Sequence, residues 1–316
     1  MSLTPAAVMV TGAAGFIGSR IVRRLMIDGF PVIGIVRSMD PGRLVRLRSL
    51  LGRPSAVPVQ LIECDLHDTQ AVTRLIRAHR PALCMHAAWD VSPDSYRHDP
   101  ANERWVECSL HLSESLLANG CAWLGVLGTC LETGGDESAR CAYAQAKSAL
   151  REQLIARLAR QDMTTGLRLC WWRVFQPYGP GEPEARLVPA LIESLLRGES
   201  FHIKCPDEVR DFIHVDDIAS AASASMAHRA MGAFDLGTGV GHRISDIARL
   251  TGDLVESRNL IEPQSQSASR NDESGSALIA NPRPLMAAAC WRWEINLRAG
   301  LSRLVDQARR GRRAIA

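Results

Sequence analysis

The chain reads Thr11-Gly12-Ala13-Ala14-Gly15-Phe16-Ile17-Gly18 between a short apolar segment, residues 8–10, and an apolar-periodic segment that continues to about residue 26. This order predicts a strand, a glycine turn and a helix. The first glycine permits the tight turn, the second lets backbone approach a pyrophosphate, and the third packs the helix against the strand. The helix N-terminus then faces the anion. The predicted dinucleotide site comprises Gly12, Ala14, Gly15, Phe16, Ile17 and Gly18.

The same alternation continues along the first half of the chain. Apolar segments that suit strands lie at residues 32–36, 57–62, 82–88 and 123–127, and segments of helix length separate them. Continuous apolar strands joined by helices indicate a parallel sheet that is covered on both faces. The sequence therefore predicts an α/β, doubly wound fold of the Rossmann type. A polar stretch, residues 264–276, is expected to be a loop.

Composition excludes several classes of protein. The chain has 316 residues, 46% of them hydrophobic, and a net charge of +3, which does not favour nucleic acid or a membrane surface as partner. Its nine cysteines form no CxxC and no paired spacing with histidines, so no metal site is expected. An odd number of cysteines, without an apolar leader or a long apolar run, predicts reduced thiols in a cytoplasmic protein.

The choice of cofactor is expected to depend on the end of the second strand. An acidic residue there binds the ribose hydroxyls of NAD, whereas a basic one accepts the 2′-phosphate of NADP. The segment ends with Arg37 and Ser38, which favours NADP, although Asp40 is close enough to keep NAD as an alternative. Asp65 and Leu66 follow the third strand and are expected near the adenine. A helix N-cap role for Asp65 or Asp68 is the alternative.

Tyr143 and Lys147 lie four residues apart in a segment of helical pattern. A phenol has an ordinary pKa of about 10, and an ammonium one helical turn away stabilises the phenolate and lowers that value. The pair therefore predicts an acid and base that can exchange a proton at neutral pH.

In this order, the motifs resemble the extended short-chain dehydrogenase/reductase family, in its nucleotide-sugar epimerase, dehydratase and ketoreductase branch. The resemblance covers nearly the whole chain. It rests on the glycine turn, Asp65-Leu66, His86-Ala87-Ala88, Thr129, Tyr143 with Lys147, Tyr178-Gly179-Pro180-Gly181, and Arg210-Asp211-Phe212-Ile213-His214-Val215-Asp216-Asp217.

The resemblance implies roles for individual residues. Tyr143 would be the catalytic acid and base, Lys147 would hold the nicotinamide ribose, and Thr129 would hydrogen-bond the reacting oxygen. Further cofactor contacts are expected from His86, Ala87, Ala88 and Pro177. Thr129 and Tyr143 are 14 residues apart, fewer than is usual in the branch, so the loop between them is short.

The resemblance also divides the chain. Residues 1–173 would form the dinucleotide-binding domain and residues 174–316 mainly a smaller substrate-binding region, with segments around 208–230 returning to the first domain. Helices at about 101–118 and 143–160 would form a homodimer contact by analogy. The expected residues that bind the nucleotide-diphosphate sugar are Trp89, Arg186, Arg210 and Arg270.

The residues after Thr129 separate the reactions of the branch. Dehydratases have an Asp-Glu pair there, but this chain has Cys130 and Leu131, which disfavours dehydration. Cys130 is expected to be buried and inert, and Glu132 to be either a solvated loop carboxylate or an extra acid or base. We expect an NAD(P)-dependent 4-keto reduction of a nucleotide sugar. The alternatives are a 4-epimerase with NAD, a reductase of an apolar ketone of the dihydroflavonol or hydroxysteroid type, and a catalytically silent cofactor sensor.

Overall fold

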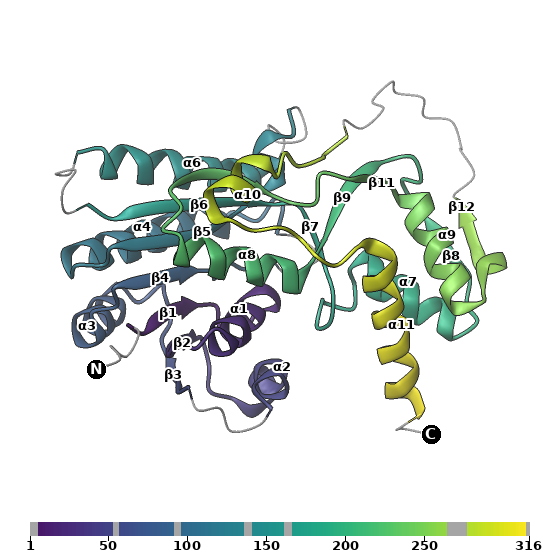
Figure 1. Cartoon of the computed structure of the whole chain (residues 1–316), viewed down its shortest axis with the longest axis horizontal. Helices are drawn as coiled ribbons and strands as arrows, with labels where there is room; N and C mark the ends of the chain where they lie inside the picture. Colours follow the sequence, from purple (N-terminus) through teal and green to yellow (C-terminus); the bar gives the residue numbers. More distant parts are fainter. Residues whose placement is uncertain are drawn as a thin grey trace.

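The computed structural model describes residues 6–52, 57–91, 96–135, 141–160, 166–263 and 277–313. Its larger part is a seven-stranded parallel sheet with the order β10-β6-β5-β4-β1-β2-β3 (Figure 1). Helices cover both faces of the sheet, which confirms the predicted doubly wound α/β fold. The strands are β1 (Val8–Thr11), β2 (Val32–Val36), β3 (Val59–Glu63), β4 (Leu83–His86), β5 (Trp123–Thr129), β6 (Arg168–Val174) and β10 (Gly232–Leu236).

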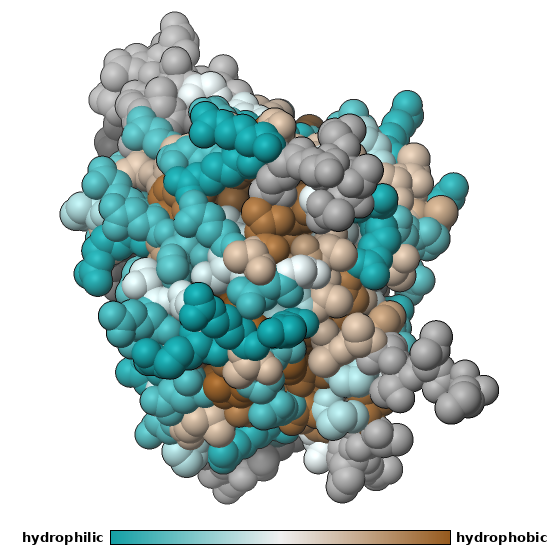
Figure 2. Space-filling model, turned by 90° about the vertical axis from the view of Figure 1, so that its left-hand side faces the viewer, coloured by the Kyte–Doolittle hydropathy of each residue, from teal (hydrophilic) through white to brown (hydrophobic). Residues whose placement is uncertain are grey.

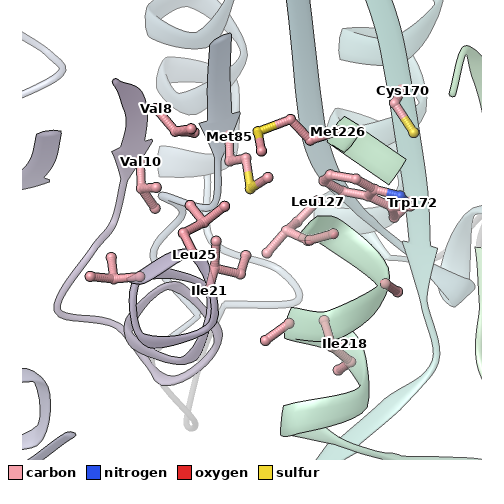
Figure 3. Close-up of a cluster of buried hydrophobic side chains, with 14 of the residues drawn as sticks. Val8, Val10, Ile21, Leu25, Met85, Leu127, Cys170, Trp172, Ile218 and Met226 are labelled. Atoms are coloured by element: carbon pink, nitrogen blue, oxygen red, sulfur yellow. The ribbon is translucent and has the colours of Figure 1, made fainter. Parts of the chain in front are cut away.

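One face of the sheet is covered by α1 (Phe16–Ile27) and α8 (Val215–Ala227), which pack on each other. Figure 3 shows Val8 and Val10 of β1 and Met85 of β4 pointing toward Ile21 and Leu25 of α1, with Trp172 and Met226 nearby. α2 (Pro41–Leu51) packs on α1, and α10 (Arg283–Ala289) packs on α8 and β10. The alternate residues of the strands face this core because side chains of a strand alternate between its two faces.

The other face carries α3 (Thr69–His79), α4 (Ala101–Ala118) and α6 (Ala142–Leu158). Their apolar side chains form a second core with Met9, Ile33 and Cys84 of the strands. α4 and α6 pack side by side, as Figure 1 also shows. A homodimer through these two helices stays a prediction. Figure 2, which views the molecule from the left-hand side of Figure 1, shows a mainly hydrophilic face with hydrophobic residues between.

The smaller part of the molecule lies beyond the carboxyl end of β6. Here β7 (Gln176–Tyr178), β9 (Val209–His214) and β11 (Gly241–Arg243) form a sheet of order β11-β9-β7, and β8 (Phe201–Ile203) pairs with β12 (Ile261–Pro263). α7 (Leu187–Leu196), α9 (Ile244–Val255) and α11 (Leu297–Arg313) surround them (Figure 1). This part has its own core. Between α7 and α9 the chain returns to the large sheet through α8 and β10.

The strand order determines where a ligand can bind. β1 lies between β2 and β4, so the chain leaves β1 and β4 in opposite directions across the sheet. A crevice forms outside the carboxyl ends of strands at such a switch point. The glycine turn after β1, the loop after β4 and the end of β5 all lie at this edge. Among the described residues, no helix is long and apolar enough to cross a membrane, and no cluster of side chains suits a metal ion.

Candidate active site

The glycine turn has the geometry that its spacing predicts. Gly12 has a φ of +66°, and a Cβ there would lie 2.8 Å from the backbone of Ala88, so only glycine fits without strain. Gly15 is the N-cap residue of α1, and its N–H donates to the carbonyl of Gly12 at 2.9 Å. A Cβ on Gly18 would collide with the same carbonyl. The turn thus leaves the N-terminus of α1 open toward the crevice, where it suits a phosphate.

Two cavities lie in the crevice. The first, of about 260 Å³, is lined by Gly15, Phe16, Ile17 and Gly18 of the turn and by Thr129, Tyr143 and Lys147. The second, of about 360 Å³, is lined by Gly12, Ala14, Gly15, Arg37, Ser38, Asp65 and Leu66. Gly15, Ala87 and Trp89 line both. The two cavities therefore meet at the glycine turn and together suit an extended dinucleotide.

The predicted catalytic residues converge on the first cavity from two neighbouring elements. Thr129 ends β5, whereas Tyr143 and Lys147 lie on one face of α6. The ammonium of Lys147 donates to the carbonyl of Leu127 at 2.7 Å, and this fixes α6 against β5. The Thr129 hydroxyl hydrogen-bonds with the Tyr143 side chain. Ala87 and Pro177 also line this cavity, and Ala88 lines the second.

Burial, rather than charge, dominates the electrostatics of this site. It raises the pKa of Tyr143, with Tyr96, Cys130 and Glu132 adding to the effect and the Thr129 hydroxyl opposing it. The four-residue spacing between Tyr143 and Lys147 alone predicts a lower pKa of Tyr143. However, Lys147 is itself desolvated. Burial lowers the pKa of Lys147 to about 7, although Glu132 opposes that shift. At neutral pH the phenol is therefore protonated, and it can act first as an acid.

His86 has a structural position. Its ring hydrogen-bonds with Thr11 Oγ1 at 2.7 Å and with Ser109 Oγ at 2.9 Å, and it is 4% exposed. Burial, helped by the charge of Lys147, lowers the pKa of His86 to about 3, so the imidazole is neutral. It supports β1 and β4 beneath the glycine turn. Direct contact of His86 with a cofactor stays a prediction.

Glu132 is not a solvated loop carboxylate. It lies in a short 3-10 helix, η1 (Cys130–Thr133), and its side chain is 0% exposed. The carboxylate accepts the backbone N–H of Thr129 at 2.8 Å and the indole N–H of Trp171 at 3.1 Å, and it pairs with Arg151 at 3.3 Å. Glu132 thus fixes the backbone of Thr129. Cys130 is 4% exposed, as expected of a buried thiol, and it lines the first cavity.

At the far end of the second cavity, the side chains of Arg37, Ser38 and Asp90 lie together. The guanidinium of Arg37 lies 3.7 Å from the carboxylate of Asp90. The carboxylate of Asp40 caps α2, because it accepts hydrogen bonds from the backbone N–H groups of Gly42 and Arg43. Asp40 is therefore engaged by the helix. Arg43 lines this cavity together with Arg37 and Ser38. Arg43 could not be identified from the sequence, because it lies inside α2 and not at the end of β2.

Asp65 and Leu66, which follow β3, also line the second cavity. The carboxylate of Asp65 accepts the N–H of His67 at 3.0 Å, in the turn after β3, while Asp68 caps α3. Of the two predicted candidates for the helix cap, Asp68 therefore takes that role and Asp65 does not. An adenine contact from Asp65 stays a prediction.

Two of the four predicted substrate-binding residues line the first cavity. Trp89 and Arg186 line the first cavity. Arg186 donates to the carbonyl of Val91 at 3.3 Å, and its guanidinium lies 5.1 Å from the ring of Tyr96. Arg210 pairs with Glu208 at 2.9 Å and lines none of the cavities identified among the described residues. Arg270 lies outside the described residues. A diphosphate contact from either Arg210 or Arg270 stays a prediction.

An aromatic wall completes the first cavity. Trp89 stacks on Trp105 with a centroid distance of 5.8 Å. Trp89 and Tyr96 each make a T-shaped contact with the ring of Tyr143, with centroid distances of 6.0 and 5.1 Å. The indole N–H of Trp89 donates to Asn102 at 2.8 Å. Tyr96 and Asn102 were not identified from the sequence. Their neighbours in the chain form no motif, and only the fold brings them to Tyr143.

Comparison with known proteins identifies the family of the chain. Residues 8–237 match the model of a family described as the NAD dependent epimerase/dehydratase family. The chain is 27% identical over 247 residues to a UDP-glucose 4-epimerase of Mycolicibacterium smegmatis, covering 73% of this chain and 77% of the relative. It is 25% identical over 248 residues to a dTDP-4-dehydro-6-deoxy-D-allose reductase of Streptomyces bikiniensis, covering 68% and 71%.

The solved structures agree on the fold. A UDP-glucose 4-epimerase of Thermotoga maritima, crystallised with UDP-glucose, superposes with a TM-score of 0.80. It has 24% identity, and the match covers 96% of this chain and 99% of that one. The family model covers more than two thirds of the sequence, including the glycine turn, Tyr143 and Lys147. The chain therefore belongs to the NAD-dependent epimerase/dehydratase family.

Proposed function

We propose that this protein is an NAD(P)-dependent enzyme that transfers a hydride at a sugar carbon of a nucleotide-diphosphate sugar. The convergence of Thr129, Tyr143 and Lys147 on a cavity that the glycine turn also lines carries the proposal. The family and the relatives, which are nucleotide-sugar epimerases and reductases by name, support the class of substrate. Dehydration is disfavoured because Leu131 cannot exchange a proton.

The residues of the cavity have distinct tasks. The cofactor, when bound, supplies or accepts the hydride. Tyr143 donates a proton to the oxygen of the carbon that is reduced, or removes it from the hydroxyl that is oxidised. Thr129 hydrogen-bonds the same oxygen, and its backbone is held by Glu132. Lys147, when protonated, stabilises the phenolate that remains after Tyr143 has given up its proton.

Net reduction of a 4-keto sugar is the reaction that the site favours. Burial keeps Tyr143 protonated in the free protein, which suits the donation of a proton. Arg37 and Arg43 at the second cavity, with Asp40 engaged as a helix cap, favour the 2′-phosphate of NADPH, the usual exchangeable reductant. Epimerisation at C4 is the second candidate, because a relative named as a UDP-glucose 4-epimerase matches most of the chain.

The bound cofactor distinguishes the two reactions. The protein is purified, denatured to release any nucleotide, and assayed for NAD and NADP. In parallel, NADPH and NADH are offered with a 4-keto nucleotide sugar, and UDP-glucose is offered without reductant. Consumption of NADPH with the keto sugar supports the proposal. Tightly bound NAD together with conversion of UDP-glucose in the absence of reductant would replace reduction by epimerisation.

A reductase of an apolar ketone is a further candidate, because the aromatic wall makes much of the first cavity apolar. An apolar ketone has no diphosphate, so its binding does not need Arg186. We expect Arg186→Ala to weaken binding of nucleotide-diphosphate sugars. Unchanged binding of every such sugar by this variant, with turnover of an apolar ketone, would favour the alternative.

A further inference from the structure

Glu182 has a partly buried carboxyl group in the first cavity that the proposed mechanism does not use. It lies in the segment between β7 and α7, and it lines the same cavity as Thr129 and Tyr143. One of its oxygens, Oε2, is inaccessible to solvent and has no hydrogen-bond partner. The carboxyl accepts the backbone N–H of Gly179. A buried polar atom without a partner costs free energy, so such an atom in a binding cavity indicates a partner that the ligand supplies.

The turn that carries Glu182 is held rigidly from several sides. Gly179 and Gly181 have φ values of +144° and +88°, and the N–H of Glu182 donates to the carbonyl of Gly179 at 3.1 Å. Arg20 of α1 donates to the carbonyl of Pro180 at 2.8 Å. These contacts give the side chain of Glu182 a fixed position. A fixed side chain loses little entropy when it binds a ligand.

The charge around Glu182 determines which chemical group suits it. Burial raises its pKa to about 8, opposed by the Gly179 N–H and by the charge of Arg186. The carboxyl is therefore largely protonated at pH 7, where it both donates and accepts hydrogen bonds. The other charged or titratable residues that line this cavity are Tyr96, Arg97, Cys130, Tyr143, Lys147 and Arg186. Arg20 and Arg46 lie against the turn.

We propose that Glu182 is a ligand-binding residue whose carboxyl group hydrogen-bonds an uncharged polar group of the bound ligands. Two ligand groups have this chemistry, the carboxamide of nicotinamide and a hydroxyl of the sugar. A phosphate does not, because it offers only acceptors and a negative charge. This inference rests on the proposed function, since it places both ligands in the first cavity.

Truncated ligands test the proposal. Dissociation constants are measured for wild type, Glu182→Ala and Glu182→Gln. The complete ligands are NADP, NAD and the nucleotide sugar that stabilises the wild type most in a thermal-shift panel. The truncated ligands are ADP-ribose, which lacks the nicotinamide, and the nucleoside diphosphate of that sugar. We expect Glu182→Ala to weaken one complete ligand by about tenfold and to leave its truncated form unchanged, which corresponds to one lost hydrogen bond of about 1.4 kcal/mol. Glu182→Gln, which keeps a donor and an acceptor without a charge, retains most of the affinity.

The arms of the experiment separate the outcomes. A loss confined to the complete dinucleotides assigns Glu182 to the carboxamide, and a loss confined to the nucleotide sugar assigns it to a hydroxyl. Equal loss for complete and truncated ligands, or none for any, overturns the proposal. Glu184→Ala, at an exposed carboxylate two residues away, is the matched control and should leave all affinities unchanged. If the wild-type protein bound none of these ligands, the proposed function itself would be overturned, and the inference with it.

The pH dependence gives a second measurement. Wild-type affinity for the complete ligand should fall as pH rises through about 8, because the carboxyl then loses its proton and its capacity to donate. Glu182→Gln should lack this fall. A fall of the same size in the variant would assign the titration to another group and would contradict the role of Glu182.

Discussion

The ammonium of Lys147 lies 3.7 Å from the centroid of the Trp89 ring, and Lys147 is only 2% exposed. The indole face thus covers the ammonium of Lys147 on α6. A cation over an aromatic face is stabilised by the ring, and here the ring also excludes water. Trp89 also lines both cavities, so the same ring lies beside each of them.

We expect Trp89→Ala to expose the amine of Lys147. The chain has only two lysines, so acylation by an amine reagent can be followed for each by mass spectrometry. Lys147 should react at least about tenfold faster in the variant, whereas Lys204, which is exposed in the wild type, should react equally in both. Equal protection of Lys147 in wild type and variant would show that Trp89 does not cover it.

Tyr143→Phe tests the proton transfer. The variant keeps the ring that packs against Trp89 and Tyr96 but loses the hydroxyl. We expect kcat to fall by about 10²–10⁴-fold, because this is the usual contribution of a positioned acid or base. Cofactor affinity should stay within about threefold of the wild type, measured by direct titration. Unchanged turnover would exclude Tyr143 as the acid.

His86 predicts a pH dependence of stability. Its pKa is lowered in the folded protein to about 3, so the unfolded state binds more protons as pH falls from about 6.5. The stability that neutral His86 provides is therefore complete above about pH 6.5 and is lost toward pH 3. His86→Asn should remove this contribution. Urea unfolding between pH 5 and 7 should show a slope smaller in the variant by up to about 1.4 kcal/mol per pH unit.

The comparison of His86→Asn with wild type isolates one titrating group. The carboxylates of the protein titrate in both proteins and cancel in the difference. An equal slope in both proteins would mean that His86 is protonated in the fold or accessible to water. That result would contradict its burial between Thr11 and Ser109.

Most of the fold could be predicted from the sequence because buried parallel strands are continuous apolar segments. Residues 32–36 match β2, and residues 101–118 match α4. β10 (Gly232–Leu236) was not predicted as a strand of the large sheet. Its five residues form no continuous apolar segment, because they include Asp235. Only its pairing with β6 makes it a strand.

The site was predictable where one element carries the signal. Tyr143 and Lys147 share a helix, so their spacing places both on one face. The contact between Trp89 and Lys147 joins residues 58 positions apart in the chain, and no local pattern encodes it. Likewise, nothing in the sequence shows that Glu132 is buried. Burial of a charged side chain is a property of the packed structure.

Arg43→Ala tests the preference for cofactor. If Arg37 and Arg43 bind a 2′-phosphate, the variant should weaken NADPH about tenfold or more and leave NADH nearly unchanged. The affinity of the wild type for NADPH should also fall with salt, more steeply than its affinity for NADH. Arg48→Ala, on the same helix and away from the cavity lining, is the control. Equal affinities of wild type for both cofactors would remove the argument for NADPH.

Glu132 is expected to act through Thr129. Glu132→Ala removes the acceptor of the Thr129 N–H and leaves Trp171 and Arg151 without their buried partner. Loss of a buried charged partner costs about 3–5 kcal/mol, so we expect a lower free energy of unfolding as well as a lower kcat. A purely structural role would lower stability and leave the activity of the folded fraction unchanged. Glu132→Gln keeps a hydrogen-bond acceptor and should recover much of kcat.

A double-mutant cycle separates positioning from stability. Thr129→Val removes the hydroxyl that contacts Tyr143 but keeps the shape of the side chain. If Glu132 acts by holding Thr129, then Glu132→Ala should reduce kcat much less in the Thr129→Val background than in the wild type. Kinetics are measured at a temperature where all four proteins are folded by circular dichroism. Additive losses in kcat would mean that Glu132 affects turnover independently of Thr129, for example through Lys147, whose pKa it raises.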